Sequence, residues 1–189
     1  MVSSSTPTYN GWQYVEGMEN AAQFSNDYTI LNPAPAGNAW TRVTTAAATG
    51  SASLKLTNTA TMLGTTDEFV SPSIDMTAIT SPVFTFKIAQ RQRTSSDADR
   101  LRVYTSTNCG QTWIQRYSKA GTTLATGTAT TSNTWTPSAS EWRTETVNVS
   151  SVQNSNNVRF KFTFESGGGN SIYIDDINII GVNGIDAPD

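Results

Sequence analysis

The chain has 189 residues, a formal net charge of −3, no histidine and one cysteine, Cys109. Without histidine it lacks the usual general base, the Ser-His and Cys-His nucleophile pairs and the commonest transition-metal ligand. One cysteine can form neither an internal disulfide nor a cysteine zinc site, so we expect a free thiol. The negative charge argues against nucleic acid as a partner, because that affinity rests on neutralised phosphates. Oxygen ligands remain, and the metal that they favour is calcium.

The length suits one domain, and the abundance of Thr, Ser, Asn and Gly suits short strands joined by polar turns. We expect no helix of any length, no membrane span and no signal peptide, because Met1 is followed by a polar Ser/Thr segment. We expect the domain at residues 9–182. Residues 1–8 are interpreted as a linker with Met1 as a cloning methionine, and residues 183–189 as the start of a linker toward a further C-terminal domain.

Two-residue alternation of apolar and polar side chains predicts at least eight strands. In chain order they lie at residues 13–19, 53–58, 83–89, 101–106, 112–117, 144–150, 159–165 and 171–181. The clearest is RFKFTFE, in which Phe160, Phe162 and Phe164 share one face and the charged residues the other. The fifth strand is expected to pair with the fourth across an NCGQ turn. This spacing predicts an all-β fold, an antiparallel two-sheet β-sandwich of jelly-roll topology.

The last strand carries two adjacent carboxylates, Asp175 and Asp176, inside an apolar run. Ile174 belongs to one apolar phase and Ile177 to the opposite one, so the phase changes at the acids. We therefore expect one acid to point inward. A buried carboxylate costs several kcal/mol or more unless it meets a cation, a metal or hydrogen-bond donors. Arginine or backbone donors without a metal remain an alternative for both acids.

The chain resembles a known family over residues 12–181. The segments that carry the resemblance are VEGMEN, YTILNPAPAGNAW, LGTTDEFVSPSIDM, LRVYTSTNCGQTW, YSKAGTTLAT, WTPSASEWRTETVNV and GGGNSIYIDDINI. Together they are similar to the jelly-roll accessory domain found downstream of pappalysin-type metallopeptidases and in other Bacteroidetes surface proteins. They are more distantly similar to the cleaved adhesin domains of gingipains and to MAM domains.

The resemblance implies a secreted, non-catalytic module, often next to a sorting domain of the type IX secretion system. It also implies a structural Ca2+ ion between the acid of the first strand, matched by Glu19, and that of the last strand, matched by Asp175. Asp176 is a secondary candidate. Relatives carry an aspartate where this chain has Ala34, which leaves Asn32 and backbone carbonyls to complete the shell. Glu16 and Glu19 are three residues apart, so only one of them can face the site.

Three functional classes follow. The first is a calcium-stabilised accessory or adhesion domain of a secreted or cell-surface multidomain bacterial protein, with the other domains of its parent as partners and no oligomer. The second is a carbohydrate-binding module on the same fold, with Trp12, Trp40 and Trp135 as aromatics that could stack on sugar, although tryptophan in a sandwich is more often core. Its partner would be a surface glycan or protein. The remote third is a glycoside hydrolase, for which the sequence offers no acid pair of suitable spacing.

Because no sugar platform stands out from the sequence, we expect weak glycan binding or none. Asp97 and Asp99 are interpreted as solvated acids at a loop-to-strand junction.

Overall fold

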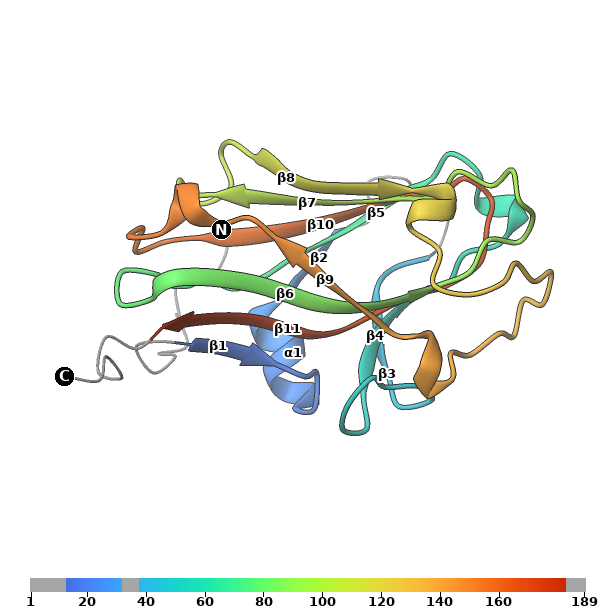
Figure 1. Ribbon diagram of the computed structural model, residues 1–189, viewed down its shortest axis with the longest axis horizontal. Coiled ribbons are helices and arrows are strands. Elements are labelled where there is room, and N and C mark those ends of the chain that lie inside the picture. Colours follow the sequence, from blue (N-terminus) through green and yellow to red (C-terminus); the bar gives the residue numbers. More distant parts are fainter. Residues whose placement is uncertain (1–12, 32–37, 183–189) are drawn as a thin grey trace.

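The computed structural model describes residues 13–31 and 38–182 of the chain. Two antiparallel sheets lie face to face, as Figure 1 shows. One has five strands in the order β2-β5-β10-β7-β8, and the other has six, in the order β3-β4-β11-β6-β9 with β1 paired to β11. The predicted two-sheet β-sandwich is therefore confirmed. The sequence-based domain boundaries stay predictions, because residues 1–8 and 183–189 lie outside the described part.

The described residues form eleven strands, one α-helix and four 3-10 helices. The strands are β1 (Gln13–Glu16), β2 (Thr29–Leu31), β3 (Thr41–Val43), β4 (Ser53–Leu56), β5 (Thr66–Val70), β6 (Thr80–Gln90), β7 (Arg100–Ser106), β8 (Ile114–Ala120), β9 (Arg143–Val147), β10 (Arg159–Glu165) and β11 (Ile172–Val182). The helices are α1 (Ala21–Asp27), η1 (Ala60–Met62), η2 (Gly121–Thr123), η3 (Ala139–Glu141) and η4 (Ser150–Val152). Among the described residues, no helix is long and apolar enough to cross a membrane.

The core lies between the sheets and is rich in aromatic rings. Phe160, Phe162 and Phe164 of β10 are all buried, as the alternation predicts. Phe162 stacks on Phe69 of β5 with ring centroids 4.5 Å apart, and Phe160 meets Phe84 of β6 at 4.4 Å. Burying each such ring contributes about 1.5–3 kcal/mol. Every second residue of β10 is thus committed to the core, which leaves the intervening ones for the opposite face of the sheet.

The prediction of no helix is wrong for residues 21–27. The Asn20 side chain caps α1 by accepting hydrogen bonds from the backbone N–H groups of Ala22 and Gln23, both at 3.1 Å. Phe24 is its one buried residue. A helix of two turns that buries a single side chain leaves no 3.6-residue period in the sequence, which explains why periodicity missed it.

The change of phase at Asp175 and Asp176 is a β-bulge in β11. The register with β6 shifts between Asp175 and Asn178, and Asp176 has a left-handed φ of 47°. Ile174 and Ile177, on either side of the bulge, both lie in the core. The bulge therefore allows two apolar phases to face the same interior, which the sequence analysis, expecting one acid to point inward, did not predict.

Candidate functional site

Asp175 is fully buried, at 0% exposure, but not between the sheets. It is two residues from Tyr173, a member of an aromatic cluster separate from the main core, and so shares the side of the six-stranded sheet that faces away from that core. There Oδ2 accepts hydrogen bonds from the backbone N–H groups of Ala48 at 2.7 Å and Thr49 at 3.3 Å, and Oδ1 from that of Asp176 at 2.7 Å. Burial nevertheless raises the pKa of Asp175 to about 6.

The other two described acids of the predicted metal site hold the same loop. Asp176 accepts a hydrogen bond from the Thr49 hydroxyl at 2.6 Å and lies 3.2 Å from the Lys87 ammonium. Glu19 accepts three: from the Ser51 hydroxyl at 2.6 Å, from the Ser51 N–H at 2.9 Å and from the Ala52 N–H at 3.0 Å. These bonds lower the pKa of Glu19. All three acids therefore bind the segment of residues 48–52, and a shared ion between Glu19 and Asp175 remains a prediction. Asn32 lies outside the described residues.

Glu16, which the sequence analysis left as the alternative to Glu19, is the more buried of the two. Its carboxylate accepts a hydrogen bond from the Met18 N–H at 2.6 Å, and burial raises its pKa, with smaller contributions of the same sign from the negative charges of Asp27 and Asp175. Within residues 13–31 and 38–182, no three acidic or cysteine side chains converge to hold an ion. A calcium ion would need backbone carbonyls as well, and its presence remains a prediction.

The predicted sugar-stacking tryptophans are not free surfaces. Trp40 is a core residue, 2% exposed, whose ring meets Phe69 edge-on at 5.0 Å. Trp135 is 8% exposed and packs edge-on against Tyr173 with ring centroids 5.6 Å apart. Both assignments are wrong for the same reason. An indole ring gains much free energy from burial, so both tryptophans are packed inside the protein and their rings are not available to a sugar. Trp12 lies outside the described residues.

A different surface gathers aromatic and polar groups: the side of the five-stranded sheet that points away from the core, here called the outer face. Its residues alternate with the core residues of the same strands, and the register aligns them across the sheet. They are Thr66 and Glu68 of β5, Lys161, Thr163 and Glu165 of β10, Arg100, Arg102 and Tyr104 of β7, and Trp113 from the β7–β8 turn.

Two aromatic rings flank one ammonium on this face. The Nζ of Lys161 lies 5.3 Å from the Tyr104 ring centroid and 5.2 Å from that of Trp113, within the range of cation–π contacts. It also lies 3.0 Å from Glu68, which accepts a hydrogen bond from the Thr163 hydroxyl at 2.7 Å. An apolar ring surface beside fixed donors and acceptors is the combination that a sugar needs, because its C–H groups and its hydroxyls seek different partners.

The turn between β7 and β8 fixes Trp113. Cys109 and Gly110 both have left-handed φ angles, 59° and 83°. A Cβ added at Gly110 would lie 3.3 Å from the Trp113 ring, so glycine allows the indole to pack against the turn. Asn108 ties the turn by accepting a hydrogen bond from the Thr112 N–H at 3.0 Å. The ring is thereby positioned before any ligand arrives.

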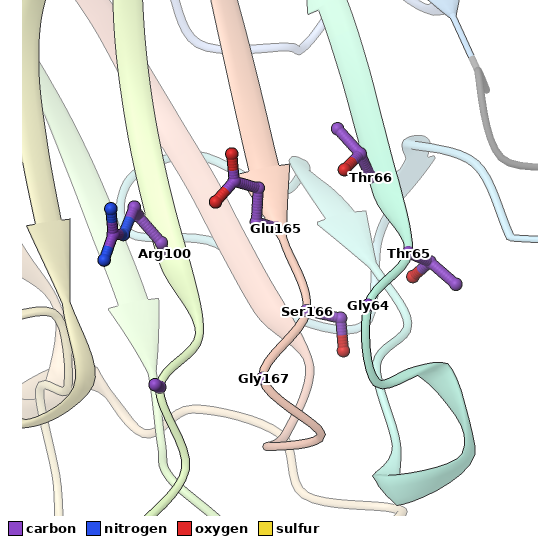
Figure 2. Close-up of a pocket in the computed structure, with 8 residues that line it drawn as sticks. Gly64, Thr65, Thr66, Arg100, Glu165, Ser166 and Gly167 are labelled. Atoms are coloured by element: carbon purple, nitrogen blue, oxygen red, sulfur yellow. The ribbon is translucent and has the colours of Figure 1, made fainter.

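A pocket of about 390 Å³ lies at one end of the outer face. Figure 2 shows Thr66, Glu165 and Arg100 side by side on the adjacent strands β5, β10 and β7. The turns at Gly64–Thr65 and Ser166–Gly167 and the residue Ala98 complete the wall. Glu165 is held by an ion pair with Arg102. The pocket is therefore polar and continuous with the face that carries the aromatic pair.

Asp99 anchors the floor of this pocket, and the interpretation of it as a solvated acid is wrong. It is fully buried and accepts hydrogen bonds from the N–H groups of Gly167 at 2.7 Å and Gly169 at 3.1 Å and from the amides of Asn58 at 3.0 Å and Gln90 at 2.8 Å. A side chain at Gly167 would collide with the backbone around Asp99. Burial raises the pKa of Asp99, and the two glycine N–H groups oppose the rise.

The sequence contained a pattern, apart from the tryptophans, that could have indicated the outer face. In RFKFTFE and LRVYTS the residues between the core positions include Lys161, Thr163, Arg102 and Tyr104. Aromatic residues and arginine are enriched in interfaces, so a strand phase that carries them can form a recognition surface. What the sequence lacks is the register that sets Tyr104 beside Lys161.

No family model and no curated protein matches this chain. Solved structures do. The K1 cleaved adhesin domain of Lys-gingipain from Porphyromonas gingivalis W83 aligns with a TM-score of 0.62 at 14% identity, over 91% of this chain and 99% of that one. The two chains therefore share a fold. The K2 cleaved adhesin domain of Lys-gingipain aligns at 0.62 with 16% identity, over 88% and 98% of the two chains.

A carbohydrate-binding domain also shares the architecture. The C-terminal family 22 carbohydrate-binding module of Clostridium thermocellum Xyn10B aligns with a TM-score of 0.53 at 14% identity, over 94% of this chain and 98% of that one. At such identities the likeness establishes the fold alone. It agrees with the resemblance to cleaved adhesin domains read from the sequence, while the links to pappalysin-associated and MAM domains remain predictions.

Proposed function

We propose that the chain is a non-catalytic binding domain that recognises carbohydrate through the outer face of its five-stranded sheet. The observation that carries the proposal is the pair of rings, Tyr104 and Trp113, set around Lys161 beside Glu68. The fold supports it, since adhesin domains and a carbohydrate-binding module share the architecture. This proposal departs from our expectation of weak or absent glycan binding, because the register sets Tyr104 beside Lys161 on one face, a pairing that the sequence did not single out.

An adhesion role fits the same surface. The aligned gingipain domains are adhesin domains by description, and adhesion through a surface glycan would use the outer face in the same way. A hydrolase needs two carboxylates that flank the scissile bond, one acting as an acid. On the outer face Glu68 and Glu165 are engaged instead with Lys161 and Arg102. This supports binding without catalysis.

The setting of the domain is part of the proposal. A secreted or cell-surface location, with other domains of a longer protein and a type IX sorting domain as neighbours, rests on the family resemblance. The proposed Ca2+ ion would lie near the end of β1 and the bulge of β11, with Glu19 and Asp175, the acids that the resemblance matches, as carboxylate ligands. Its effect would be to join the two strands and to neutralise their carboxylates.

Glycan-array screening followed by affinity electrophoresis tests the proposal. We expect Tyr104→Ala and Trp113→Ala each to weaken binding of a glycan hit at least tenfold, because truncating an aromatic that anchors a ligand commonly costs about 2 kcal/mol or more. Trp142→Ala is the matched control: this half-buried indole lies beside the other sheet, with its ring centroid 6.3 Å from that of Tyr173, and its loss should leave binding unchanged. Equal losses in all three variants, with intact melting curves, would refute the assignment of this face.

A further inference from the structure

We infer that the pocket at the end of the outer face binds the carboxylate of an acidic sugar, with Arg100 as its direct partner. The inference rests on the proposed function, because it treats the pocket as one end of a saccharide-binding face. It adds the chemical class of the ligand: a uronic-acid or similar carboxylated unit within an oligosaccharide.

The charges of the outer face single out Arg100. Arg102 is paired with Glu165, and Lys161 with Glu68, so these cations are neutralised within the face. The side chain of Arg100 lines the pocket but makes no hydrogen bond or ion pair with any residue in the described part of the chain. Glu165, the cross-strand neighbour of Arg100, is ion-paired with Arg102 instead, so the half-buried guanidinium of Arg100 can take its anion from a ligand. Its planar fork matches a carboxylate in two parallel hydrogen bonds.

The other groups of the pocket favour a sugar over an acidic peptide side chain. The hydroxyl of Thr66 points toward Glu165 in Figure 2 and makes no hydrogen bond within residues 13–31 and 38–182, so it can both donate to and accept from a sugar hydroxyl. The side chain of Thr65 points to the other side of the strand. Among the described residues, no large apolar side chain lines the pocket, whereas peptide segments usually also seek apolar contacts. The pocket therefore offers the unpaired cation of Arg100, the hydroxyl of Thr66 and the carboxylate of Glu165, whose charge is neutralised by Arg102. These groups match a polyol that carries one carboxylate.

The pocket and the aromatic pair lie along the same face of strand β7. Arg100 and Tyr104 are four residues apart on the same face of β7, a separation of about 13 Å along the strand. A saccharide chain that follows β7 would place a carboxylated unit at Arg100 and a further ring at Tyr104 and Trp113. The floor is rigid, because Asp99 holds the Gly167–Gly169 turn by two backbone hydrogen bonds. Little ordering would be needed on binding.

Isothermal titration with paired ligands provides the test. The probes are oligogalacturonic acid, glucuronate-containing oligosaccharides and alginate oligosaccharides, each compared with its methyl ester, which keeps the sugar and removes the charge. We expect at least one acid form to bind ten or more times more tightly than its ester, the difference that one charge-assisted bidentate contact contributes. Raising the salt concentration should weaken binding of the acid but not of the ester.

Two variants locate the effect. Arg100→Gln should reduce binding of the acid at least tenfold and leave the ester unchanged, with no loss of melting temperature because Arg100 has no described partner to lose. Arg159→Gln is the matched control: it removes the same charge from the other end of β10, where Arg159 makes one long contact, 3.5 Å, to the Ser71 carbonyl. It should bind the acid as wild type does.

Several outcomes would overturn the inference. Acid and ester binding equally, Arg159→Gln losing as much as Arg100→Gln, or no binding of any acidic probe would each do so. A poly-glutamate peptide that binds as tightly as the acid sugars would assign the pocket to protein carboxylates instead. If neutral glycans bind through Tyr104 and Trp113 while Arg100→Gln has no effect, the proposed function stands and this inference fails. If no glycan binds at all, both fail.

Discussion

A substitution at Asp67 provides the sharpest test of the energetics of this sandwich. Asp67 lies on β5 opposite Phe164 of β10, two residues before the core position Phe69, and is 4% exposed. Its Oδ1 atom has no hydrogen-bond partner among the described residues. Burial raises the pKa of this carboxyl from its ordinary 3.8 to about 6. The folded protein therefore bears a cost whenever Asp67 is ionised.

The sign and size of that cost follow from proton linkage. The unfolded chain releases this proton near pH 3.8 and the folded chain near pH 6. Between these values the folded state binds more protons, so the free energy of unfolding falls as the pH rises through this window. A tenfold difference in proton affinity between the two states corresponds to about 1.4 kcal/mol. The rise in pKa from 3.8 to about 6 therefore lowers the free energy of unfolding by at most about 3 kcal/mol above about pH 7, and not at all below about pH 4.

Asp67→Asn keeps the size of the side chain and removes the charge. Urea denaturation should give wild type and variant nearly equal stability at about pH 4, with the variant more stable by about 2–3 kcal/mol at about pH 8. The control is Asp75→Asn, because hydrogen bonds from Thr77 lower the pKa of the exposed Asp75. That variant should be less stable than wild type at about pH 8. The measured quantity is the difference in free energy of unfolding between Asp67→Asn and wild type. If this difference is no larger at about pH 8 than at about pH 4, the reasoning is refuted.

Three further predictions concern other sites. Asp99→Ala should lower the free energy of unfolding by about 3 kcal/mol or more, measured by urea denaturation, because it leaves buried glycine N–H groups without acceptors; a loss below about 1 kcal/mol would contradict this role. Calcium in hundredfold excess over its Kd should add about 2.7 kcal/mol and raise the melting temperature by several degrees over that in chelator. Asp175→Ala should abolish that difference and Asp97→Ala should keep it, whereas identical curves for wild type in calcium and chelator would reject the ion. Cys109 is free and exposed, so titration of the native protein should find one reactive thiol without denaturant, and finding none would show that it is shielded.

The sequence predicted those parts of the fold in which local pattern and burial agree. The predicted strand at residues 159–165 coincides with β10, because three phenylalanines mark its core phase. The bulge at Asp175 was visible as a change of phase. By contrast, β2 and β3 have three residues each, too few for alternation to show, and β5 buries a carboxylate, Asp67, where the pattern expects an apolar residue.

The candidate site was harder to predict because it depends on contacts distant in the sequence. Spacing showed that Glu16 and Glu19 cannot both face one point, but the choice between them depends on the turn at Met18, which has a left-handed φ of 60°. Tyr104 and Lys161 meet only because β7 and β10 pair in one register. Alternation placed each of them on a polar face, and only the sheet brings them together.

The alternation of β10 has a consequence for how such domains diversify. Phe160, Phe162 and Phe164 are fixed by packing, whereas Lys161, Thr163 and Glu165 face outward between them. Substitutions at the outward positions change few core contacts, so a single strand can evolve new ligand preferences while its contribution to folding is preserved. Descendants of one ancestral sandwich could thus diverge in what they recognise through changes at every second residue, and a library restricted to these positions would retain folded members at high frequency.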